Sequence, residues 1–450
     1  MKKIKKIEVL IVGAGQAGLS ISYLLAKHGI RHVVLEKGEV ADSWKNQRWD
    51  IFQLTTQNWQ NRLPGFRYKG KYPAHFSSKV EVTRYLESYQ QKFKLPVKTG
   101  IEVQSINKKQ NDLFEVLTNH GKYLASSVVI ATGSFSTPNI PKEGSQLPQA
   151  ICQIHSSAYR NPGSLPPGAV LVIGGGQSGF EIASDLSQRG RKVYLSMGRT
   201  FFLPRRYRGS DIMHWLSETG IVDLPASFFP GGPRMSSTPS PVILRDLSEL
   251  ETKKKPGSQA CSFATWLNSS QVTLLGRFSF AEQSILNFDQ NLPQALSEAK
   301  TYYQRVTRLI DSYIKKNKIT STAKGTDCAK IFFPMLLPTP SKIDLQHHPI
   351  KTVIWSTGFR EKYSWIHLPV FSKNGNPQFK RGITQMPGFY FLGLHWLHNL
   401  KSGSLFGVKD DALYIFKDLL QVLSTQSFKP QIYPNTKSSL ATVINTNSMR

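Results

Sequence analysis

Residues 7–29 read IEVLIVGAGQAGLSISYLLAKHG, and residues 169–190 read AVLVIGGGQSGFEIASDLSQRG. Each stretch combines a short apolar run, glycines in the pattern G-x-G-x-x-G, and an amphipathic helical pattern, which in the first stretch predicts a helix over Gln16–Lys27. This order of strand, turn and helix is typical of a dinucleotide-binding unit, in which backbone N–H groups and a helix N-terminus face a pyrophosphate. One such string arises easily by chance. Two in the same context predict a chain that holds two dinucleotides and passes electrons between them.

The three glycines of each turn have different predicted roles. The first permits the tight turn, the second lets the backbone approach the pyrophosphate, and the third lets the helix pack closely on the strand. These cofactor positions are Gly13, Gly15 and Gly18 in the first turn and Gly174, Gly176 and Gly179 in the second, with Gln16, Gln177 and Ser178 beside them.

The end of the second strand in each unit indicates which nucleotide binds. Glu36 lies 23 residues after Gly13 (36 − 13), where a carboxylate accepts hydrogen bonds from ribose hydroxyls and repels a 2′-phosphate. The second unit has no carboxylate there, and Arg199 lies where a guanidinium can bind a 2′-phosphate. The first site is therefore predicted to suit FAD or NAD, whereas the second favours NADPH over NADH.

The composition is that of a globular protein large enough for two domains, with 450 residues and 40% hydrophobic content. No apolar stretch resembles a membrane-spanning helix, and the basic N-terminus leads directly into the first turn, so we expect a cytoplasmic protein without a cleavable signal. The three cysteines form no C-x-x-C pair. We therefore expect reduced thiols and no metal site, and the missing dithiol excludes the disulfide reductases.

The formal net charge of +28 is unusually high. A basic surface attracts anionic partners such as nucleic acid or a membrane surface. Lysine and arginine are nevertheless spread along the chain, and no nucleic-acid-binding module is recognised. We expect no specific nucleic-acid partner. Weak association with anionic membranes stays an alternative to a surface that merely favours anionic cofactors, and the oligomeric state is open.

Two further strands end in similar tripeptides, Ala131-Thr132-Gly133 and Ser356-Thr357-Gly358. Small residues at such positions let the backbone pass close to a cofactor. Together with the two turns, VVIATGSFSTPNIP and VIWSTGFR give the chain a resemblance to the class B flavin-dependent monooxygenases, the flavin-containing monooxygenase family. The resemblance covers nearly all of residues 5–420. The stretches WDIFQLTTQNWQNRLPGF, PRRYRGSDIMHWLSETG and GFYFLGLHWLHNLKSGSLFGVKDDA look like a bacterial subgroup of FAD-dependent oxidoreductases.

The resemblance implies an α/β fold with two Rossmann-like dinucleotide-binding domains, the NADPH-binding domain being inserted in the FAD-binding domain. We expect the FAD-binding domain to comprise residues 1–165 and 341–423. Residues 166–340 would form the NADPH-binding domain, with a Pro-, Ser- and Lys-rich insertion near residues 230–258. Residues 424–450 are expected to be a flexible tail.

The resemblance also implies a monooxygenase. NADPH would reduce the flavin, O2 would give a C4a-hydroperoxyflavin, and one oxygen atom would pass to a small nucleophilic substrate of the amine or sulfide type. The family hallmark F-x-G-x-x-x-H-x-x-x-[Y/F] is half present, because His155 and Tyr159 fit whereas Gln149 and Ile151 replace Phe and Gly. A flavin-dependent NAD(P)H oxidase or dehydrogenase without stable oxygenation is therefore an alternative. A membrane-associated or nucleotide-sensing regulator is another.

Several side chains near the flavin follow from the resemblance. An amide is expected in the loop after the first β–α–β unit, where Asn58 is favoured over the neighbouring Gln57, with ordinary loop polarity as the alternative. Trp44, together with Trp49 and Trp59, would stack on the flavin or line the substrate pocket, although at least two of the three are expected to be core residues.

His155 has two interpretations, an acid–base group and an interdomain hinge residue bonded to backbone, and the second is preferred. Asp411 opens the last predicted helix, whose N-terminus would face the flavin, with a structural N-cap as the compatible alternative. The remaining predicted cofactor residues are Lys37, Thr132, Gly133, Thr357 and Gly358.

Overall fold

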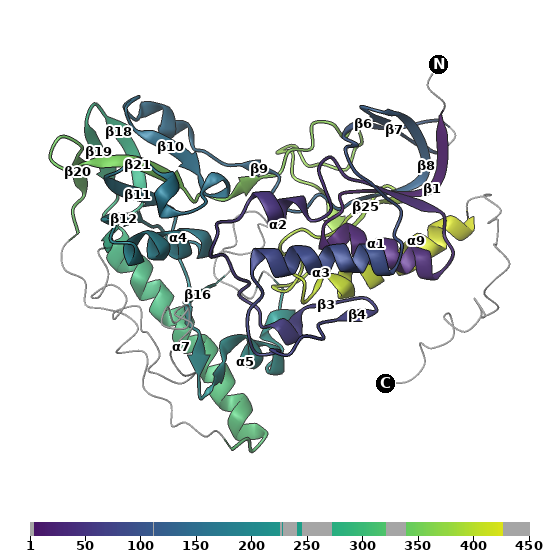
Figure 1. Ribbon diagram of the computed structural model, residues 1–450. Helices are drawn as coiled ribbons and strands as arrows, with labels where there is room; N and C mark the ends of the chain where they lie inside the picture. Colours follow the sequence, from purple (N-terminus) through teal and green to yellow (C-terminus); the bar gives the residue numbers. More distant parts are fainter. Residues whose placement is uncertain are drawn as a thin grey trace.

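The structure is a computed structural model that describes residues 4–110, 112–225, 227, 241–244, 272–320 and 339–425. Most of the insertion predicted near 230–258, and the predicted tail beyond residue 425, lie outside these ranges. Two α/β units stand side by side, as Figure 1 shows. The first contains the N-terminal segment and the last helix, and the second is built from the middle of the chain.

The first unit is built on a mixed sheet whose central strands are parallel and include β1 (Lys5–Val12). β1 pairs in parallel with β2 (His32–Leu35) and with β8 (Gly121–Ile130), and β8 pairs in parallel with β25 (Phe389–Phe391). The sheet therefore combines strands from both ends of the described chain. Its other members are β5 (Val97–Lys98), β6 (Val103–Lys108), β7 (Phe114–Thr118), β23 (Phe379–Lys380) and β24 (Ile383–Thr384).

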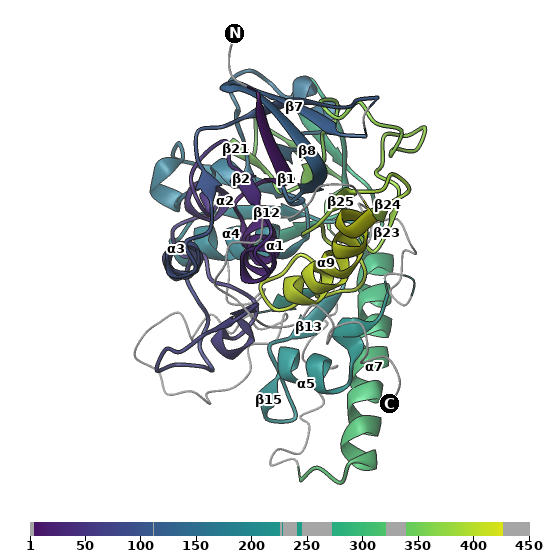
Figure 2. The ribbon, with the colours of Figure 1, turned by 90° about the vertical axis from the view of Figure 1, so that its right-hand side faces the viewer.

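Three helices pack together in the first unit. α1 (Gln16–Lys27) contacts both α3 (Lys79–Lys92) and α9 (Val408–Thr425), and Figure 2 shows α9 beside α1. α3 begins with a capping box, in which Ser78 and Glu81 each accept from the other's backbone N–H. The helical pattern correctly predicted the bounds Gln16–Lys27, and most residues of this helix are buried in the core of the first unit.

The second unit has a five-stranded sheet in which every pair of neighbours is parallel. Its order is β10 (Cys152–His155), β21 (Ile350–Trp355), β11 (Ala169–Ile173), β12 (Val193–Ser196) and β17 (Val272–Leu275). β10 and β21 lie outside the range 166–340 predicted for this domain, so the sheet extends beyond those limits on both sides.

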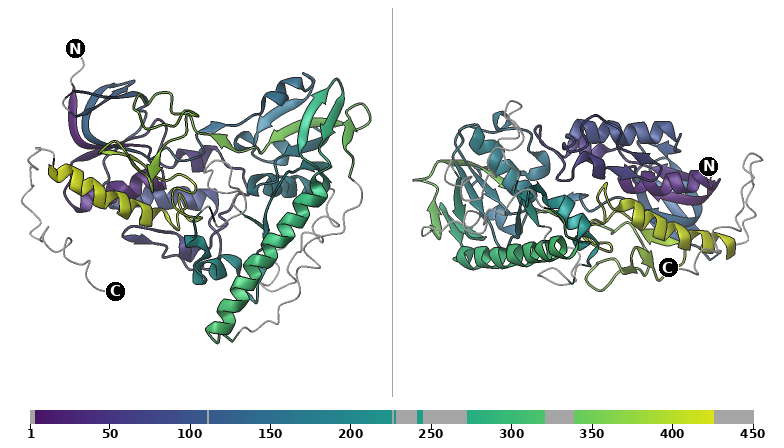
Figure 3. Two further views of the ribbon diagram at one scale, coloured as in Figure 1. Left: turned by 180° about the vertical axis from the view of Figure 1, so that it is seen from behind. Right: turned by 90° about the horizontal axis from the view of Figure 1, so that it is seen from below.

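An antiparallel sheet and a long helix complete the second unit. The sheet consists of β18 (Phe278–Glu282), β19 (Ile285–Phe288) and β20 (Lys342–Asp344). The helix α7 (Leu292–Lys316) extends along this unit, as both views of Figure 3 show. The remaining elements are α2 (Asp42–Asn46), α4 (Gln177–Gln188), α5 (Ile212–Glu218), β3 (Arg62–Leu63), β4 (Phe66–Arg67), β13 (Phe202–Pro204), β14 (Arg206–Tyr207), β15 (Ser210–Asp211) and β16 (Val242–Leu244). Short 3-10 helices cover Asn58–Gln60, Lys142–Gln146, Ser156–Ala158, Pro162–Ser164 and Ile221–Asp223.

The chain crosses between the units twice, and the two crossings are hydrogen-bonded to each other. β9 (Thr137–Pro138) pairs antiparallel with β22 (Phe359–Arg360). A shared apolar cluster also joins the units, in which Trp215 and Val306 of the second unit pack with Trp396 and Phe406 of the first. Packed apolar side chains and paired strands therefore fix the second glycine turn relative to the first.

Candidate functional site: two dinucleotide turns and a deep cavity

The first glycine turn is held by close backbone contacts at two of its glycines. Gly13 has a φ of +108°, and a Cβ there would lie 2.6 Å from the carbonyl oxygen of Ala131. At Gly18 a Cβ would lie 1.9 Å from the carbonyl oxygen of Gly13. At Gly15, by contrast, a Cβ would meet nothing within 4 Å. The outer glycines are thus required by the turn itself, whereas the middle one faces open space.

The second turn repeats this geometry. Gly174 has a φ of +122°, and a Cβ there would lie 2.2 Å from the carbonyl oxygen of Ser356. A Cβ at Gly179 would lie 1.8 Å from the carbonyl oxygen of Gly174, while a Cβ at Gly176 would meet nothing within 4 Å. Ser356-Thr357-Gly358 therefore packs against the second turn as Ala131-Thr132-Gly133 packs against the first.

The helices that follow the two turns begin without a side-chain cap. Gly15 and Gly176 are the N-cap residues of α1 and α4, and neither helix has a capping hydrogen bond from a side chain to its first backbone N–H groups. α3 differs, because Ser78 caps it. The first N–H groups of α1 and α4 are left to bind an anion, which fits the pyrophosphate of a dinucleotide.

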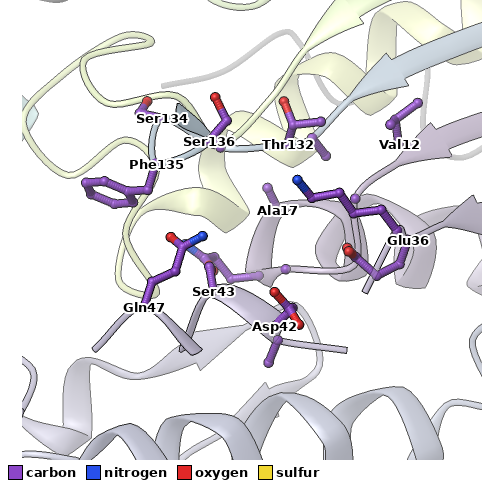
Figure 4. A pocket seen from close by; sticks show the side chains of 18 of the residues that line it. Val12, Ala17, Glu36, Asp42, Ser43, Gln47, Thr132, Ser134, Phe135 and Ser136 are labelled. Carbon is purple, nitrogen blue, oxygen red and sulfur yellow. The ribbon is translucent and has the colours of Figure 1, made fainter. Parts of the chain in front are cut away.

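A cavity of about 320 Å³ lies over the first turn. Figure 4 shows Glu36 on one side of it and Phe135 and Gln47 on the opposite side. The cavity brings together eight of the predicted cofactor residues, namely Gly13, Gly15, Gln16, Glu36, Lys37, Trp44, Thr132 and Gly133.

Glu36 is held in place by the backbone of the turn. Its carboxylate accepts from the Ala14 N–H at 2.7 Å and from the Gly38 N–H at 2.9 Å. The side chain also lines the cavity. A carboxylate so fixed at the end of β2 is placed to accept from ribose hydroxyls.

Three residues that the motif analysis did not single out also line the cavity: Arg48, Phe135 and His395. The ring of His395 lies 4.9 Å from that of Phe135. Desolvation by the surrounding residues, and secondarily the charge of Arg48, lowers the pKa of His395 to about 4, although the residue is exposed at the cavity. Arg48 and His395 are far apart in sequence and follow no motif spacing, so no local signal marks them. Phe135 could have been suspected, because it directly follows the Ala131-Thr132-Gly133 strand end.

The tryptophans of the long loop occupy different environments. Trp44 donates from Nε1 to the amide oxygen of Gln16 at 3.1 Å, and it lines the cavity. Trp49 is buried in the core of the second unit, whereas Trp59 is exposed. Of the three, Trp44 is thus the one that the structure places at the cofactor cavity.

The side chains of both candidate amides form hydrogen bonds within their own loop. Asn58 is buried, donates to the carbonyl oxygen of Tyr72 at 3.0 Å and accepts from Ser77 Oγ at 2.6 Å. The amide oxygen of Gln57 accepts from Nε1 of Trp59 at 2.9 Å. Neither residue belongs to the lining of the cavity, and their role near the flavin stays a prediction.

His155 is bonded to the segment that returns from the second unit. Its Nε2 lies 2.8 Å from the carbonyl oxygen of Gly358, and its Nδ1 accepts from the Ser157 N–H at 3.1 Å. These contacts fit a neutral ring with the proton on Nε2, and burial lowers the pKa of His155. This geometry favours the interpretation of His155 as an interdomain hinge residue.

Tyr159, the other retained hallmark residue, reaches into α4. Its hydroxyl donates to Oδ2 of Asp185 at 2.7 Å, and both residues are buried. Burial raises the pKa of Asp185. The two hallmark residues together fix the crossing segment, His155 against Gly358 and Tyr159 against the helix of the second turn.

The remaining predicted residues take up separate positions. Gln177 brackets the backbone of Ile243, accepting from its N–H at 2.9 Å and donating to its carbonyl oxygen at 3.2 Å. Arg199 is exposed after β12, with its guanidinium 6.0 Å from the ring centre of Phe201. Asp411 is the fourth residue of α9 rather than its N-cap, and it pairs with Arg381 at 3.0 Å outside the cavity lining.

Ser178 is the second residue of α4, and the Thr357 hydroxyl donates to the carbonyl oxygen of Asn139. In the part of the chain that the structure describes, no cluster of His, Cys, Asp or Glu is arranged to hold a metal ion. No helix among the described residues is long and apolar enough to span a membrane.

Comparison with known proteins places both turns in one family model. The model of the pyridine nucleotide-disulphide oxidoreductases matches residues 10–219. An uncharacterized CzcO-like oxidoreductase of Geobacillus kaustophilus is 33% identical over 417 residues, which are 92% of this chain and 98% of that protein. A probable indole-3-pyruvate monooxygenase of Arabidopsis thaliana is 30% identical over 205 residues, 44% of this chain and 49% of that protein.

Solved structures share the fold. A flavin-containing monooxygenase from Stenotrophomonas maltophilia superposes with a TM-score of 0.62 at 18% identity, covering 93% of this chain and 99% of the other. At this identity the likeness speaks for the architecture alone. It agrees with the prediction of an α/β chain with two Rossmann-type units.

Proposed function

The chain belongs to the bacterial CzcO-like oxidoreductases, and from this premise we propose that it is an FAD- and NADPH-dependent monooxygenase. The proposed reaction inserts one oxygen atom from O2 into a small nucleophilic substrate of the amine or sulfide type. The protein is an oxidoreductase, and the prediction of FAD and NADP(H) as its cofactors is confirmed at the level of the family. We further propose that the second unit is the NADPH-binding domain, inserted in the FAD-binding domain.

One observation carries this proposal. Both turns combine an uncapped helix N-terminus with a middle glycine that faces open space. Such a turn can accept a pyrophosphate against its backbone without moving, because no side chain of the turn occupies that space. Two such turns joined by hydrogen-bonded crossings suit a chain that brings two dinucleotides together.

Residues of the first unit would hold FAD. Bound FAD supplies the redox chemistry, because it accepts two electrons from NADPH and passes them to O2. The turn around Gly15 would bind the pyrophosphate, and Glu36 would accept from the ribose of the adenosine half. Trp44 and Phe135 line the cavity beyond the turn, where their apolar faces would exclude water from the redox ring.

Residues of the second unit would hold NADPH and orient it. The turn around Gly176 would bind its pyrophosphate, and the exposed Arg199 would bind the 2′-phosphate. His155 and Tyr159 do not need to touch either cofactor, since their bonds to Gly358 and Asp185 position the second turn. We therefore assign them a positioning role.

The reaction class can be tested by measuring three quantities together. NADPH consumed, H2O2 released and oxygenated product formed would be followed on the yellow holoprotein against amines, sulfides and ketones, with 18O2 as the oxygen source. We expect at least one amine or sulfide to acquire 18O while the peroxide yield falls. Stoichiometric peroxide with every compound would reject the monooxygenase in favour of the oxidase, the alternative suggested by Gln149 and Ile151.

The coenzyme assignment is tested by Arg199→Ala. Losing a charged hydrogen bond to the 2′-phosphate, about 1.5–3 kcal/mol, should raise the KM for NADPH by about 10–100-fold and leave the KM for NADH nearly unchanged. Arg189→Ala is the matched control, because Arg189 is an exposed guanidinium at the opposite end of α4. Equal changes in both KM values for Arg199→Ala would remove the reason for choosing NADPH.

A further inference from the structure

Arg48 is a buried cation at the end of the cavity opposite Glu36. Its side chain is only 8% exposed. The guanidinium carbon lies 5.0 Å from the ring centre of Trp44, 5.5 Å from that of Phe52 and 5.1 Å from that of Phe135. Aromatic faces attract a guanidinium through their quadrupoles without neutralising its charge.

The hydrogen bonds of Arg48 leave most of its donors unused. Nη1 donates to the carbonyl oxygen of Gln47 at 3.0 Å. Among the residues that the structure describes, no carboxylate lies within ion-pair distance of this guanidinium. Burial lowers the pKa of Arg48 to about 10, and the charge of Glu181 on α4 partly opposes this shift. Arg48 is therefore still a cation at neutral pH, and a buried cation of this kind is costly unless an anion joins it.

The two ends of the cavity carry different side chains, and this difference identifies the part of the cofactor that Arg48 would contact. Glu36 marks the ribose of the adenosine half, and the turn at Gly15 marks the pyrophosphate. Phe135 and Gln47 lie at the opposite end, as Figure 4 shows, and Arg48 stacks on Phe135 there. A dinucleotide with its adenosine half at Glu36 extends its redox ring toward Arg48.

Other basic side chains that line the cavity do not offer the same environment. Lys37 and Lys362 are exposed, so water screens their charges. His395 lies at the Phe135 end, but it is exposed like the two lysines, and its lowered pKa favours the neutral ring. The Arg48 charge acts in a low-dielectric surrounding, where it stabilises a nearby anion more strongly than it would in water.

We propose that Arg48 is the counter-cation of the reduced flavin and raises the reduction potential of the bound FAD. This inference rests on the proposed function, since it requires that the chain binds FAD. Hydride transfer breaks a C–H bond of the nicotinamide and forms an N–H bond on the flavin, leaving NADP⁺ and a reduced flavin that carries one negative charge. Arg48 stabilises this charge, and protein charges near the ring are a recognised means of tuning the flavin.

The test is the two-electron midpoint potential of the bound flavin, measured at equilibrium against a reference dye. Arg48→Gln removes the charge and should shift the redox equilibrium about 10–100-fold toward oxidised flavin, which is about 30–60 mV more negative at about 30 mV per tenfold. Arg48→Lys should keep at least half of the native effect. Arg62→Gln is the matched control, because Arg62 stacks on Phe406 at 4.9 Å outside the cavity lining, and its potential should equal that of the native protein.

The possible outcomes separate this inference from its premise. If Arg48→Gln loses FAD during purification, the dissociation constants of oxidised and reduced FAD for the refilled apoprotein give the same potential difference. An unchanged potential in Arg48→Gln overturns the inference. It is also overturned if the potential stays unchanged while the binding of benzoate, a planar anionic probe, falls, because the cation would then serve a substrate. A native protein that binds no FAD would instead reject the proposed function.

Discussion

The two glycine turns share their internal construction and differ in what surrounds them. In both, the first and third glycines are enforced by backbone contacts, and a strand end with small residues packs against the first glycine. The recognition groups differ. Glu36 is fixed by two backbone N–H donors, whereas Arg199 is exposed and lies over the ring of Phe201. The shared part of each turn suits any pyrophosphate, so under the proposed function the surroundings would decide which dinucleotide stays and which one exchanges.

The glutamine that follows each turn also differs in its hydrogen-bond partners. Gln16 donates to the carbonyl oxygen of Gly403 and accepts from Trp44, which joins the turn to the C-terminal segment of its own unit. Gln177 brackets the backbone of Ile243 within the second unit. The first turn is thus enclosed by distant parts of the chain, as expected for a resident cofactor. The side chain of Gln177 bonds only within the second unit, to Ile243 and to Glu181 of α4, as expected for a coenzyme that leaves after each turnover.

The largest effect is expected from alanine at the third glycine of either turn. Gly18→Ala or Gly179→Ala places a Cβ less than 2 Å from the carbonyl oxygen of Gly13 or Gly174, which should cost about 4 kcal/mol or more of unfolding free energy. Urea unfolding of the apoprotein, followed by circular dichroism, measures this loss. Gly15→Ala is the control, since its Cβ enters open space. Equal urea midpoints for Gly18→Ala and Gly15→Ala would contradict the division of roles within the turn.

The local structure was predictable because periodicity and turn chemistry determine it. α1 was predicted with its observed bounds, and the two turns were identified from their glycines between an apolar run and a helical pattern. The range 166–340 predicted for the second domain does not include two strands of its sheet. β10 pairs with β21, and β21 pairs with β11. Strand pairing over some 200 residues leaves no trace in a short window of sequence.

The cavity was predictable only in part, for a related reason. Cavity residues that belong to the glycine-turn motif, such as Gly15 and Glu36, follow fixed spacings and were identified. Arg48 and His395 meet at the cavity because a loop and a segment from opposite ends of the chain converge there. Trp49 shows the opposite case, because this loop residue is buried in the core of the other unit. Composition alone does not tell whether a loop residue lines the cavity or is buried in the core of the other unit.

Valine at the middle glycine should make each turn lose a different ligand. Gly15→Val and Gly176→Val each put a side chain into the open space of a turn. Losing two charge-assisted bonds to a pyrophosphate, about 1.5–3 kcal/mol each, should weaken binding by about 100-fold or more. Gly15→Val should purify colourless, whereas Gly176→Val should stay yellow and lose reduction by NADPH. Flavin absorbance and NADPH oxidation measure the two effects, and dithionite reduction of Gly176→Val controls for an intact flavin site.

A colourless Gly176→Val, or a yellow Gly15→Val that NADPH no longer reduces, would reverse the assignment of the two sites. Loss of both ligands in both variants would mean that the turns form one cooperative site. Either outcome would remove the distinction between a resident and an exchanging dinucleotide.

The smallest of these effects is expected from the two glutamines, and it tests the surroundings rather than the turns. Gln16→Ala and Gln177→Ala each remove two or more hydrogen bonds, which should lower the unfolding free energy by about 1–2 kcal/mol. Because Gln16 joins the first turn to Gly403 and Trp44, its removal should speed FAD release several-fold and leave the KM for NADPH unchanged. Gln177→Ala should raise that KM several-fold and leave FAD release unchanged. Fluorescence of the released flavin on dilution and steady-state kinetics measure these quantities. A faster FAD release in Gln177→Ala would mean that the segment at Ile243 also closes the first site, and the enclosure of that site would then depend on both units.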